Sequence, residues 1–344
     1  MAISNIQSSP VPPLAASQSS PLVMRIIGAV ALAHLINDLI QAVLPSIYPM
    51  LKANYGLTFT QVGLITLTFQ ITASLLQPWV GYYTDRHPNP LLLPAGAICT
   101  LVGIVMLSMV GSFPLILLAS ALIGVGSSTF HPEASRIARL ASGGRFGLAQ
   151  STFQVGGNAG SAFGPLLAAA IIIPFGQGNV AWFGLFAVFA IGLLYAISRW
   201  YRAHLNLFKL KAGQQATHGL SKKRVTGALM VLGFLVFSKY FYMASFTSYF
   251  TFYLIQKFDL SVASSQLHLF LFLGAVAAGT FFGGPIGDKV GRKTVIWFSI
   301  LGVAPFTLML PYADLFWTSV LSVIIGFILA SAFSAIVVFA QELV

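Results

Sequence analysis

The polar residues with the clearest capacity for chemistry interrupt an apolar stretch near the amino terminus, HLINDLIQAVLP. On a helix, positions i, i+4, i+7 and i+11 of this stretch share one face, and they hold His34, Asp38, Gln41 and Pro45. Asp38 follows Arg25 by 13 residues, or about 20 Å of helix, so we expect it near the middle of a bilayer. We predict that Asp38, with His34 beside it, carries protons, because burial favours the neutral form of a carboxyl group. The competing interpretation is a polar contact that only locks helices together.

A lysine interrupts a second apolar stretch, SKYFYMASFTSYFTFY. Positions i, i+3, i+10 and i+14 again share one helical face, and they hold Lys239, Tyr242, Tyr249 and Tyr253. A cation among phenolic donors suits an anionic substrate such as a phosphonate, whose oxygens accept charge-assisted hydrogen bonds. We therefore predict that these four residues bind substrate. The alternative is a structural ion pair between Lys239 and Asp38.

Three more ionisable residues occur in the stretch STFHPEASR, at His131, Glu133 and Arg136. Glu133 and Arg136 are three residues apart, so they share one face of a helix. One interpretation gives Glu133 a part in proton coupling, and gives His131 and Arg136 contacts with the substrate. The other is a local salt bridge at the end of a helix, and both stay open at this point.

Amide side chains in further apolar stretches are candidates for the lining of a substrate pathway. These are Gln41, Gln70, Gln154 and Asn158. Small residues surround Asn158 at a spacing typical of close helix packing. We assign packing rather than binding to this set, which is Gly157, Gly160, Gly164 and Pro165.

The elements that must position these residues are membrane spans. Hydrophobic residues make up 57% of the 344-residue chain, charged residues 7%, and the mean hydropathy is +0.87, which excludes a water-soluble domain. Crossing a bilayer takes roughly 20 apolar residues of helix. We predict an all-α polytopic membrane protein with ten spans, at about 26–50, 61–82, 91–111, 114–135, 149–173, 180–199, 225–255, 265–287, 294–312 and 315–339.

The lysines and arginines predict the orientation of the spans. The chain has 18 lysines and arginines. Lys52 and Lys257 fall on one side of the membrane, and Lys239 falls inside a predicted span. By the positive-inside rule, the side that carries the other cations is cytoplasmic, and so is the amino terminus. This pattern of alternate loops argues against nucleic acid as the partner for the net charge of +11. The other fifteen cations are Arg25, Arg86, Arg136, Arg139, Arg145, Arg199, Arg202, Lys209, Lys211, Lys222, Lys223, Arg224, Lys289, Arg292 and Lys293.

Two similar loops indicate an internal repeat. GYYTDR (81–86) ends the second span, GPIGDK (284–289) ends the eighth, and their aspartates are 203 positions apart. Six spans in the first half make the repeats parallel, which places a ligand between two bundles near the membrane midplane. The predicted organisation is a disordered cytoplasmic tail (1–24), a six-helix bundle (25–201), a cytoplasmic linker (202–224) and a second bundle (225–344).

The loop motifs resemble the signature of the major facilitator superfamily, Gly-x-x-x-Asp-(Arg/Lys)-x-Gly-(Arg/Lys)-(Arg/Lys). The stretch GNAGSAFGP in the fifth span is similar to a signature of that family's antiporters. HLINDLIQ, SSTFHPEASRIARLASGGR, FQVGGN and SKYFYMAS look like segments of its bacterial fosmidomycin resistance branch. The residues that match the loop signature are Gly81, Asp85 and Arg86 in the first copy, and Gly284, Asp288, Lys289, Gly291, Arg292 and Lys293 in the second.

The resemblance implies a monomeric two-bundle exporter of anionic drugs, without cofactor or metal, that exchanges drug for protons by alternating access. It also implies that Asp85 and Asp288 dock against helix starts of the opposite bundle and hold the inward side shut. The family has six spans in each half, so we expect this chain, with six and four, to be a shortened version that lacks the last two spans. The eleventh span, the implied partner of Asp85, would then be missing.

Two other functions compete with export. A proton-coupled or passive carrier of another small metabolite or sugar would have the same fold. A membrane-embedded enzyme would use His34 with Asp38, or His131 with Glu133, as a general base or metal site. The enzyme is the weaker hypothesis, because neither pair stands at a recognisable catalytic spacing and no serine, cysteine or glycine elbow accompanies them.

Overall fold

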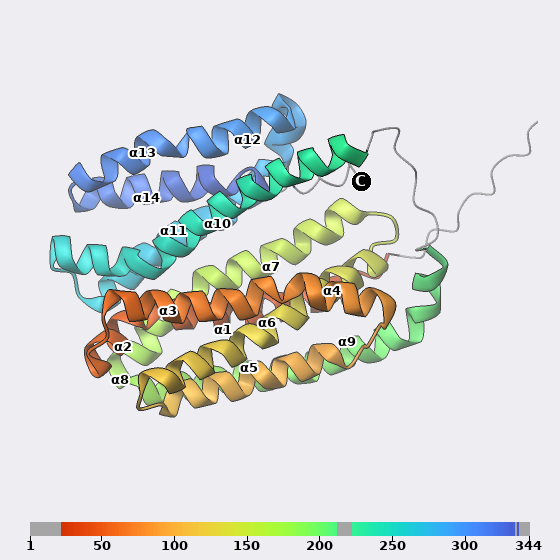
Figure 1. Ribbon diagram of the computed structural model, residues 1–344, viewed down its shortest axis with the longest axis horizontal. Helices are drawn as coiled ribbons and strands as arrows, with labels where there is room; N and C mark the ends of the chain where they lie inside the picture. The colour runs from red at the N-terminus through yellow and green to blue at the C-terminus, as the bar shows by residue number, and fades with distance from the viewer. Residues whose placement is uncertain (1–21, 212–221, 334–335, 337–344) are drawn as a thin grey trace, which may run out of the picture.

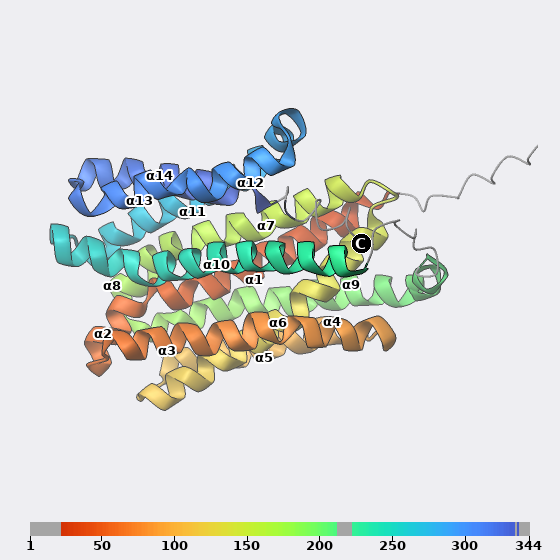
Figure 2. The ribbon, with the colours of Figure 1, turned by 45° about the horizontal axis from the view of Figure 1, so that its top comes forward.

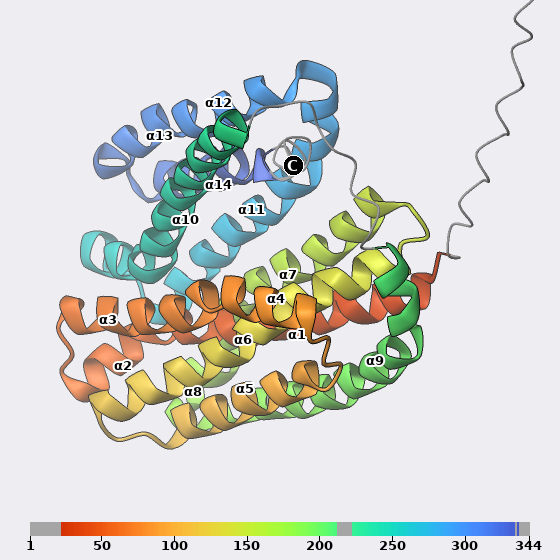
Figure 3. The ribbon, with the colours of Figure 1, turned by 45° about the vertical axis from the view of Figure 1, so that its right-hand side comes forward.

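The computed structural model describes residues 22–211, 222–333 and 336, apart from the side chains at positions 146, 147, 206–211, 222, 284, 285, 288 and 292. All regular secondary structure in these ranges is helical, as Figure 1 shows. Figure 3 shows the helices in two groups, with α1–α9 in one and α10–α14 in the other. The predicted all-α, two-bundle architecture is therefore confirmed for the described residues.

The helices of the first group follow the predicted spans closely. Pro45 lies in the last turn of α1, and Gly56, with φ of 61°, ends α2 in the left-handed conformation. Thr58 and Gln61 form a capping box at the start of α3. In chain order the helices are α1 (Met24–Ser46), α2 (Tyr48–Tyr55), α3 (Phe59–Gln70), α4 (Gln77–Arg86), α5 (Leu92–Met109), α6 (Phe113–Ala141), α7 (Phe146–Leu167), α8 (Ile173–Phe175) and α9 (Phe183–Lys211). Two π-helical turns (Ile71–Leu75 and Ala168–Ile172) and a 3₁₀ turn (Gln177–Trp182) join some of them.

The second group continues after the predicted linker. Helix α9 extends through the first part of 202–224, and α10 begins at Lys222. The bounds are α10 (Lys222–Phe258), α11 (Val262–Val290), α12 (Arg292–Leu301), α13 (Val303–Met309), a 3₁₀ turn (Leu310–Tyr312) and α14 (Leu315–Ala330). The predicted tail, 1–24, lies mostly outside the described residues.

Nine helical segments in the described ranges are long and apolar enough to cross a membrane. They coincide with the first nine predicted spans. Helix α14 is apolar but has 16 residues, about 24 Å of helix, and most positions after 333 lie outside the described residues. The chain is a multi-pass membrane protein.

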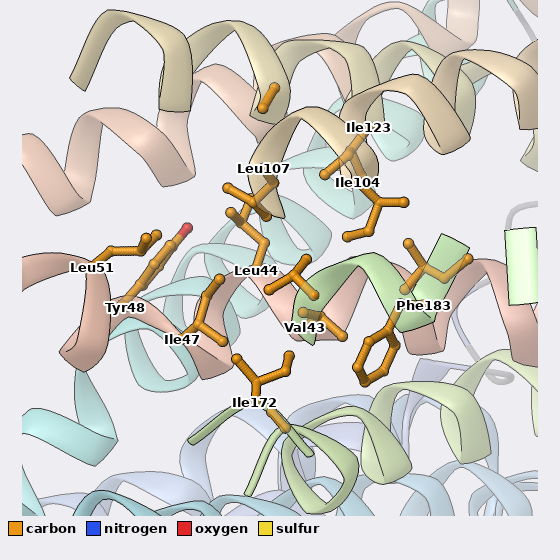
Figure 4. Packing of buried hydrophobic residues seen from close by; sticks show 14 of the residues in the cluster. Val43, Leu44, Ile47, Tyr48, Leu51, Ile104, Leu107, Ile123, Ile172 and Phe183 are labelled. Atoms are coloured by element: carbon orange, nitrogen blue, oxygen red, sulfur yellow. The ribbon is translucent and has the colours of Figure 1, made fainter. Parts of the chain in front are cut away.

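The core of the first group surrounds α1. Within a bilayer such packing is stabilised by van der Waals contact rather than by exclusion of water. Buried side chains of α1, α5, α6 and α9 meet here, which fixes the orientation of α1 and of the polar stripe on its other face. Figure 4 shows part of this core, which includes Val43, Leu44, Ile47, Ile104, Leu107, Ile123, Ile172 and Phe183.

Glycines allow α7 to approach α1 at backbone distance. A Cβ added at Gly160 would lie 2.0 Å from the Leu35 carbonyl oxygen, and one at Gly164 would lie 2.4 Å from Ala42 Cβ. Gly157, on the same face of α7, lies against His34 and Asp38. Any side chain at these positions would separate the two helices. The contact brings α7 directly behind the polar stripe of α1.

The two groups are joined at one end, which we call the sealed end, formed by α2, the start of α3, the end of α10 and the start of α11. Gln266 is fully buried and its Nε2 donates to the Ser46 carbonyl oxygen at 2.7 Å. Thr66 Oγ1 lies 3.0 Å from Ser248 Oγ, and the Tyr249 hydroxyl donates to the Phe59 carbonyl oxygen at 3.3 Å. Figure 2 shows α10 running along the boundary between the groups.

At the opposite end, which we call the basic end, α4, α6, α9 and α11 finish and α7 and α10 begin. No hydrogen bond or ion pair joins the two groups there among the side chains that the structure describes. Trp79 and Tyr82 of α4 and Phe234 and Phe237 of α10 remain exposed. The described polar contacts between the groups therefore close the molecule at the sealed end only.

Candidate functional site

Asp38 is the centre of a polar cluster that α1 and α6 build together. His34, one turn earlier on α1, places Nε2 3.3 Å from Asp38 Oδ2. His131 of α6 places Nε2 3.6 Å from Asp38 Oδ1. The stripe predicted on α1 thus meets the histidine predicted on the fourth span, and each carboxylate oxygen faces one imidazole.

Two amides complete the surroundings of the carboxylate. Asn37 Nδ2 and Gln41 Nε2 donate to Asp38 Oδ1, at 3.0 and 3.3 Å. Ser127 of α6 then donates to Gln41 Oε1 at 3.1 Å. Oδ1 therefore accepts two amide hydrogen bonds in addition to its contact with His131, whereas Oδ2 faces His34.

The far side of each imidazole is fixed by a backbone carbonyl. His34 Nδ1 lies 2.7 Å from the Phe153 carbonyl oxygen, and the His34 ring stacks on the Phe153 ring with centroids 4.0 Å apart. His131 Nδ1 lies 3.1 Å from the Ser127 carbonyl oxygen, one turn earlier on α6. Such contacts hold the orientation of both rings, so both Nε2 atoms point at the carboxylate.

The three groups differ in their access to solvent. His34 is only 3% exposed, while the side chains of Asp38 and His131 are 19% and 26% exposed. A Cβ at Gly157 would lie 2.3 Å from His34 Nε2 and 2.8 Å from Asp38 Oδ2. Glycine at 157 is therefore required for the histidine and the aspartate to pack against α7.

The cluster offers two imidazole nitrogens and a carboxylate within 4.8 Å of one another, a donor set that a divalent metal could use. However, two amide N–H groups already point at Oδ1. Their positive hydrogens would repel a cation bound at that oxygen.

Arg136 lies in a second polar network, at the basic end. Its guanidinium forms ion pairs with Glu133, one turn earlier on α6, and with Asp85 at the end of α4, and it donates to Thr84 Oγ1 at 3.1 Å. Glu133 is fully buried. The local salt bridge left open by the sequence is therefore present.

The partner of Asp85 differs from the one that the resemblance implied. The resemblance implied docking of Asp85 against the eleventh span, and because that span was expected to be missing, we expected the contact to be open. Asp85 instead pairs with Arg136 of its own bundle. Arg136, for which one interpretation was contact with the substrate, thus makes two ion pairs within its own bundle. It can do so because the end of α4 packs against α6. Arg86 points elsewhere and stacks on Tyr82, 3.6 Å from the ring centroid, and Gly81 packs near Pro132.

Lys239 forms no ion pair with Asp38. Its Nζ donates to Ser299 Oγ of α12 at 2.9 Å. No carboxylate among the side chains that the structure describes lies within ion-pair distance of it. The alternative of a structural Lys239 to Asp38 pair is therefore not what the structure shows, and Lys239 remains a half-buried cation in the second bundle.

The three tyrosines predicted beside Lys239 do not share one environment. The Tyr242 hydroxyl lies 2.9 Å from Thr307 Oγ1 of α13, and Tyr253 donates to the Leu310 carbonyl oxygen at 2.9 Å. Tyr249 turns to α3, as described above. The three hydroxyls meet different partners because one helical stripe on a 37-residue helix passes several neighbouring segments. All three hydroxyls form hydrogen bonds to other segments of the chain.

The remaining amides have separate positions. Gln70 accepts a hydrogen bond from Ser74, one turn away on its own segment, at 3.1 Å. Gln154 and Asn158 lie one turn apart on α7, half-buried, and Asn158 Nδ2 has no hydrogen-bond partner in the described residues. Asn158 is one turn from Ala162, which packs in the core of the second group. Asn158 thus lies on the α7 stripe that faces the second bundle.

The second loop motif is only partly described. Gly284, Asp288 and Arg292 are among the residues whose side chains lie outside the description, so the expected contact of Asp288 is not placed. Lys289 and Lys293 are exposed at the basic end. Gly291, with φ of 91°, separates α11 from α12, a conformation that favours glycine.

Sequence reasoning missed several residues of these networks. Asn37 is adjacent to Asp38 but falls off the helical stripe used to select candidates. Ser127 lies one turn before His131, a spacing that could have found it. Gln266 and Ser248 gave only the weak signal of a polar residue in an apolar span.

Curated relatives match nearly the whole chain. The model of the Major Facilitator Superfamily matches residues 30–344. The chain is 63% identical over 318 residues to the fosmidomycin resistance protein of Escherichia coli (strain K12), which covers 92% of this chain and 78% of that protein. It is 40% identical, with the same coverage, to the uncharacterized MFS-type transporter YfnC of Bacillus subtilis (strain 168).

Solved transporters share the fold at low sequence identity. A bacterial homologue of the human lysosomal transporter Spinster, in an inward-facing and occupied conformation, superposes with a TM-score of 0.70 at 16% identity, covering 92% of this chain and 74% of that one. A D-xylose–proton symporter gives 0.69 at 17% identity, covering 91% and 80%. Sequence and fold agree: the protein is a transporter rather than a membrane-embedded enzyme, and the chain belongs to the major facilitator superfamily.

Proposed function

We propose that this protein exports an anionic drug of the phosphonate class across the bacterial inner membrane in exchange for protons. The observation that carries the proposal is the 63% identity to a relative named for fosmidomycin resistance. The polar clusters supply the chemistry that such an exchange needs. The transporter acts as a monomer, because each chain contains both polar sites.

The arrangement of the helices supports alternating access. The basic end carries the loops rich in lysine and arginine, so the positive-inside rule makes it cytoplasmic, along with the amino terminus. The described contacts between the bundles are at the sealed end. In this proposal the structure represents an inward-open state, and export requires the sealed end to open while the basic end closes.

The Asp38 cluster is the proton site in this proposal. It combines one carboxylate and two imidazoles in a partly buried position within the first bundle. Histidine and a shielded carboxyl group can both change charge in the physiological range. Glu133 contributes indirectly, because its ion pair with Arg136 holds the end of α6 that presents His131.

Lys239 is the anion site. A half-buried cation without a carboxylate partner among the described residues has an unfilled requirement for negative charge, and a phosphonate oxygen meets it with a charge-assisted hydrogen bond. Ser299 already orients the ammonium group. Asn158, whose Nδ2 has no hydrogen-bond partner in the described part of the chain, adds a donor from the other bundle.

The separation of the two sites bears on how exchange is coupled. A proton and an anion attract, so direct electrostatics alone would favour carrying both together. Exchange requires the opposite: drug binding and proton binding must each weaken the other, by the same free energy. In this proposal the weakening comes from the conformational change, which moves the bundle with Lys239 relative to the bundle with Asp38.

Transport by the purified protein in liposomes tests the proposal. An imposed pH gradient should drive uptake of radiolabelled fosmidomycin into vesicles that hold the protein in the inverted orientation, and an uncoupler should abolish it. Uptake unaffected by the uncoupler would identify a passive carrier. Absence of phosphonate uptake, together with uptake of a sugar, would identify a carrier of the competing class.

A further inference from the structure

Backbone contacts determine which nitrogen of each cluster histidine carries hydrogen. His34 Nδ1 lies 2.7 Å from the carbonyl oxygen of Phe153, and His131 Nδ1 lies 3.1 Å from that of Ser127. A carbonyl oxygen can only accept a hydrogen bond. Both Nδ1 atoms must therefore be the donors, and a neutral ring in either position has its lone pair on Nε2.

Both Nε2 atoms face an oxygen of Asp38, at 3.3 and 3.6 Å. An ionised carboxylate also only accepts hydrogen bonds. With both histidines neutral, each contact would set one lone pair against another in a site with little water, which is costly. The geometry therefore requires at least one further proton between the imidazoles and the carboxylate.

The two carboxylate oxygens are not equivalent in this respect. Oδ1, which faces His131, already accepts from Asn37 and Gln41. Among the described residues, Oδ2, which faces His34, has no hydrogen-bond donor other than that imidazole. Removing the proton from His34 would leave Oδ2 unsatisfied, whereas removing it from His131 leaves Oδ1 with two hydrogen bonds.

Access to solvent points to the same histidine. His34 is 3% exposed, stacked on Phe153 and confined by Gly157. The His131 side chain is 26% exposed, and its contact with Asp38 is the longer one. A proton can leave His131 without a rearrangement of the core.

Other ionisable groups near the cluster have their own roles or remain neutral. On α6, Glu133 pairs with Arg136. On α10, Tyr240 lies within electrostatic range of Asp38, and Lys239 donates to Ser299. The described residues of α7 that contact the cluster, Phe153 and Gly157, do not titrate.

We propose that His131 is the residue that exchanges the coupling proton, while His34 stays protonated as the fixed partner of the ionised Asp38. This inference rests on the proton-coupled export proposed above and assigns its proton to one atom, His131 Nε2. The cluster then alternates between neutral and a single positive charge. Asp38 itself remains ionised throughout.

Nitrogen-15 NMR of the full-length protein, labelled at histidine, tests the proposal without any drug. Between about pH 5 and pH 9, the range in which histidine titrates, His131 should change from doubly protonated to neutral with hydrogen on Nδ1. His34 should stay doubly protonated. A neutral His131 with hydrogen on Nε2, or titration of His34 while His131 does not change, would overturn the assignment.

A functional arm uses His131→Gln, because the glutamine amide can donate to Asp38 but cannot release a proton. The variant should remain folded, as its thermal midpoint in detergent shows, while uptake driven by a pH gradient should fall to the level measured with an uncoupler. The matched control is His268→Gln, since His268 Nδ1 has the same contact with a carbonyl one turn earlier, at 2.9 Å from Ser264, but no carboxylate within ion-pair distance among the described residues. Gradient-driven uptake in His131→Gln equal to that of the control would refute the proposal. If the unaltered protein transports no phosphonate, the export proposal fails while the NMR titration still decides this one.

Discussion

His34 Nε2 and Asp38 Oδ2 lie 3.3 Å apart on α1, and the bare backbone of Gly157 leaves the space for them. Helix spacing brings the pair together, but α7 determines its environment. The charge of the pair is thus tied to the packing of two helices. Any movement of α7 relative to α1 would alter the contact on which the proposed proton binding depends.

Gly157→Ala should disrupt the Asp38 cluster from the side of α7. The added methyl group would lie 2.3 Å from His34 Nε2, so the histidine or α7 must move, at a cost of about 1–3 kcal/mol. We expect gradient-driven uptake to fall at least about tenfold and the thermal midpoint to decrease. Gly192→Ala is the control, because a Cβ there meets nothing within 4 Å. Equal behaviour of the two variants would contradict the role of Gly157.

Lys239→Ala should weaken binding of the anionic drug. Loss of a hydrogen bond to a charged group costs about 1.5–3 kcal/mol, so the dissociation constant measured by calorimetry in detergent should rise roughly ten- to hundredfold. Lys257→Ala is a suitable control, since Lys257 donates to the Pro311 and Ala313 carbonyl oxygens at the sealed end. Unchanged affinity in Lys239→Ala would remove Lys239 from the substrate site.

Arg136→Ala should destabilise the protein rather than change its substrate affinity. It leaves the fully buried Glu133 without its ion-pair partner, which typically costs about 3–5 kcal/mol. Adding Glu133→Gln to the same chain should recover much of the thermal midpoint, because the buried charge is then gone. No recovery in the double variant would show that Arg136 acts through other contacts.

Gln266→Ala should loosen the sealed end. It removes the buried hydrogen bond to the Ser46 carbonyl, so the population with an open sealed end should increase. Spin labels at Ala53 and Gln256, exposed positions on opposite bundles, would report this by pulsed electron paramagnetic resonance in a Cys99→Ser background. We expect a longer distance component in Gln266→Ala and none in Gln70→Ala, because the described hydrogen bond of the Gln70 amide lies within its own segment. An identical distance distribution in both variants would argue against the seal.

Hydropathy and helical spacing predicted the features that depend on one segment at a time. The membrane spans follow from apolar length, and the contact of His34 with Asp38 follows from their separation by one turn. The local pair of Glu133 with Arg136 follows in the same way. These predictions needed no knowledge of how the helices are arranged.

Contacts between distant segments could not be predicted in this way. His131 reaches Asp38, and Asp85 reaches Arg136, only because α6 packs against α1 and α4. The tyrosine stripe on α10 shows the limit most clearly. Helical spacing indicated which tyrosines share a face of α10. It could not indicate that the Tyr242 hydroxyl bonds to Thr307 and the Tyr249 hydroxyl to Phe59, two residues from different bundles.

The most direct test of proton-coupled export is the number of protons that the purified protein exchanges when it transports one phosphonate. Proton flux and drug flux should be measured together in liposomes, for the unaltered protein and for Asp38→Asn, which keeps the shape of the side chain but removes its charge. We predict opposite fluxes of drug and protons in the unaltered protein, and loss of the proton flux in Asp38→Asn with the protein still folded in the membrane. Undiminished proton flux in Asp38→Asn would contradict the assignment of the coupling site to this cluster.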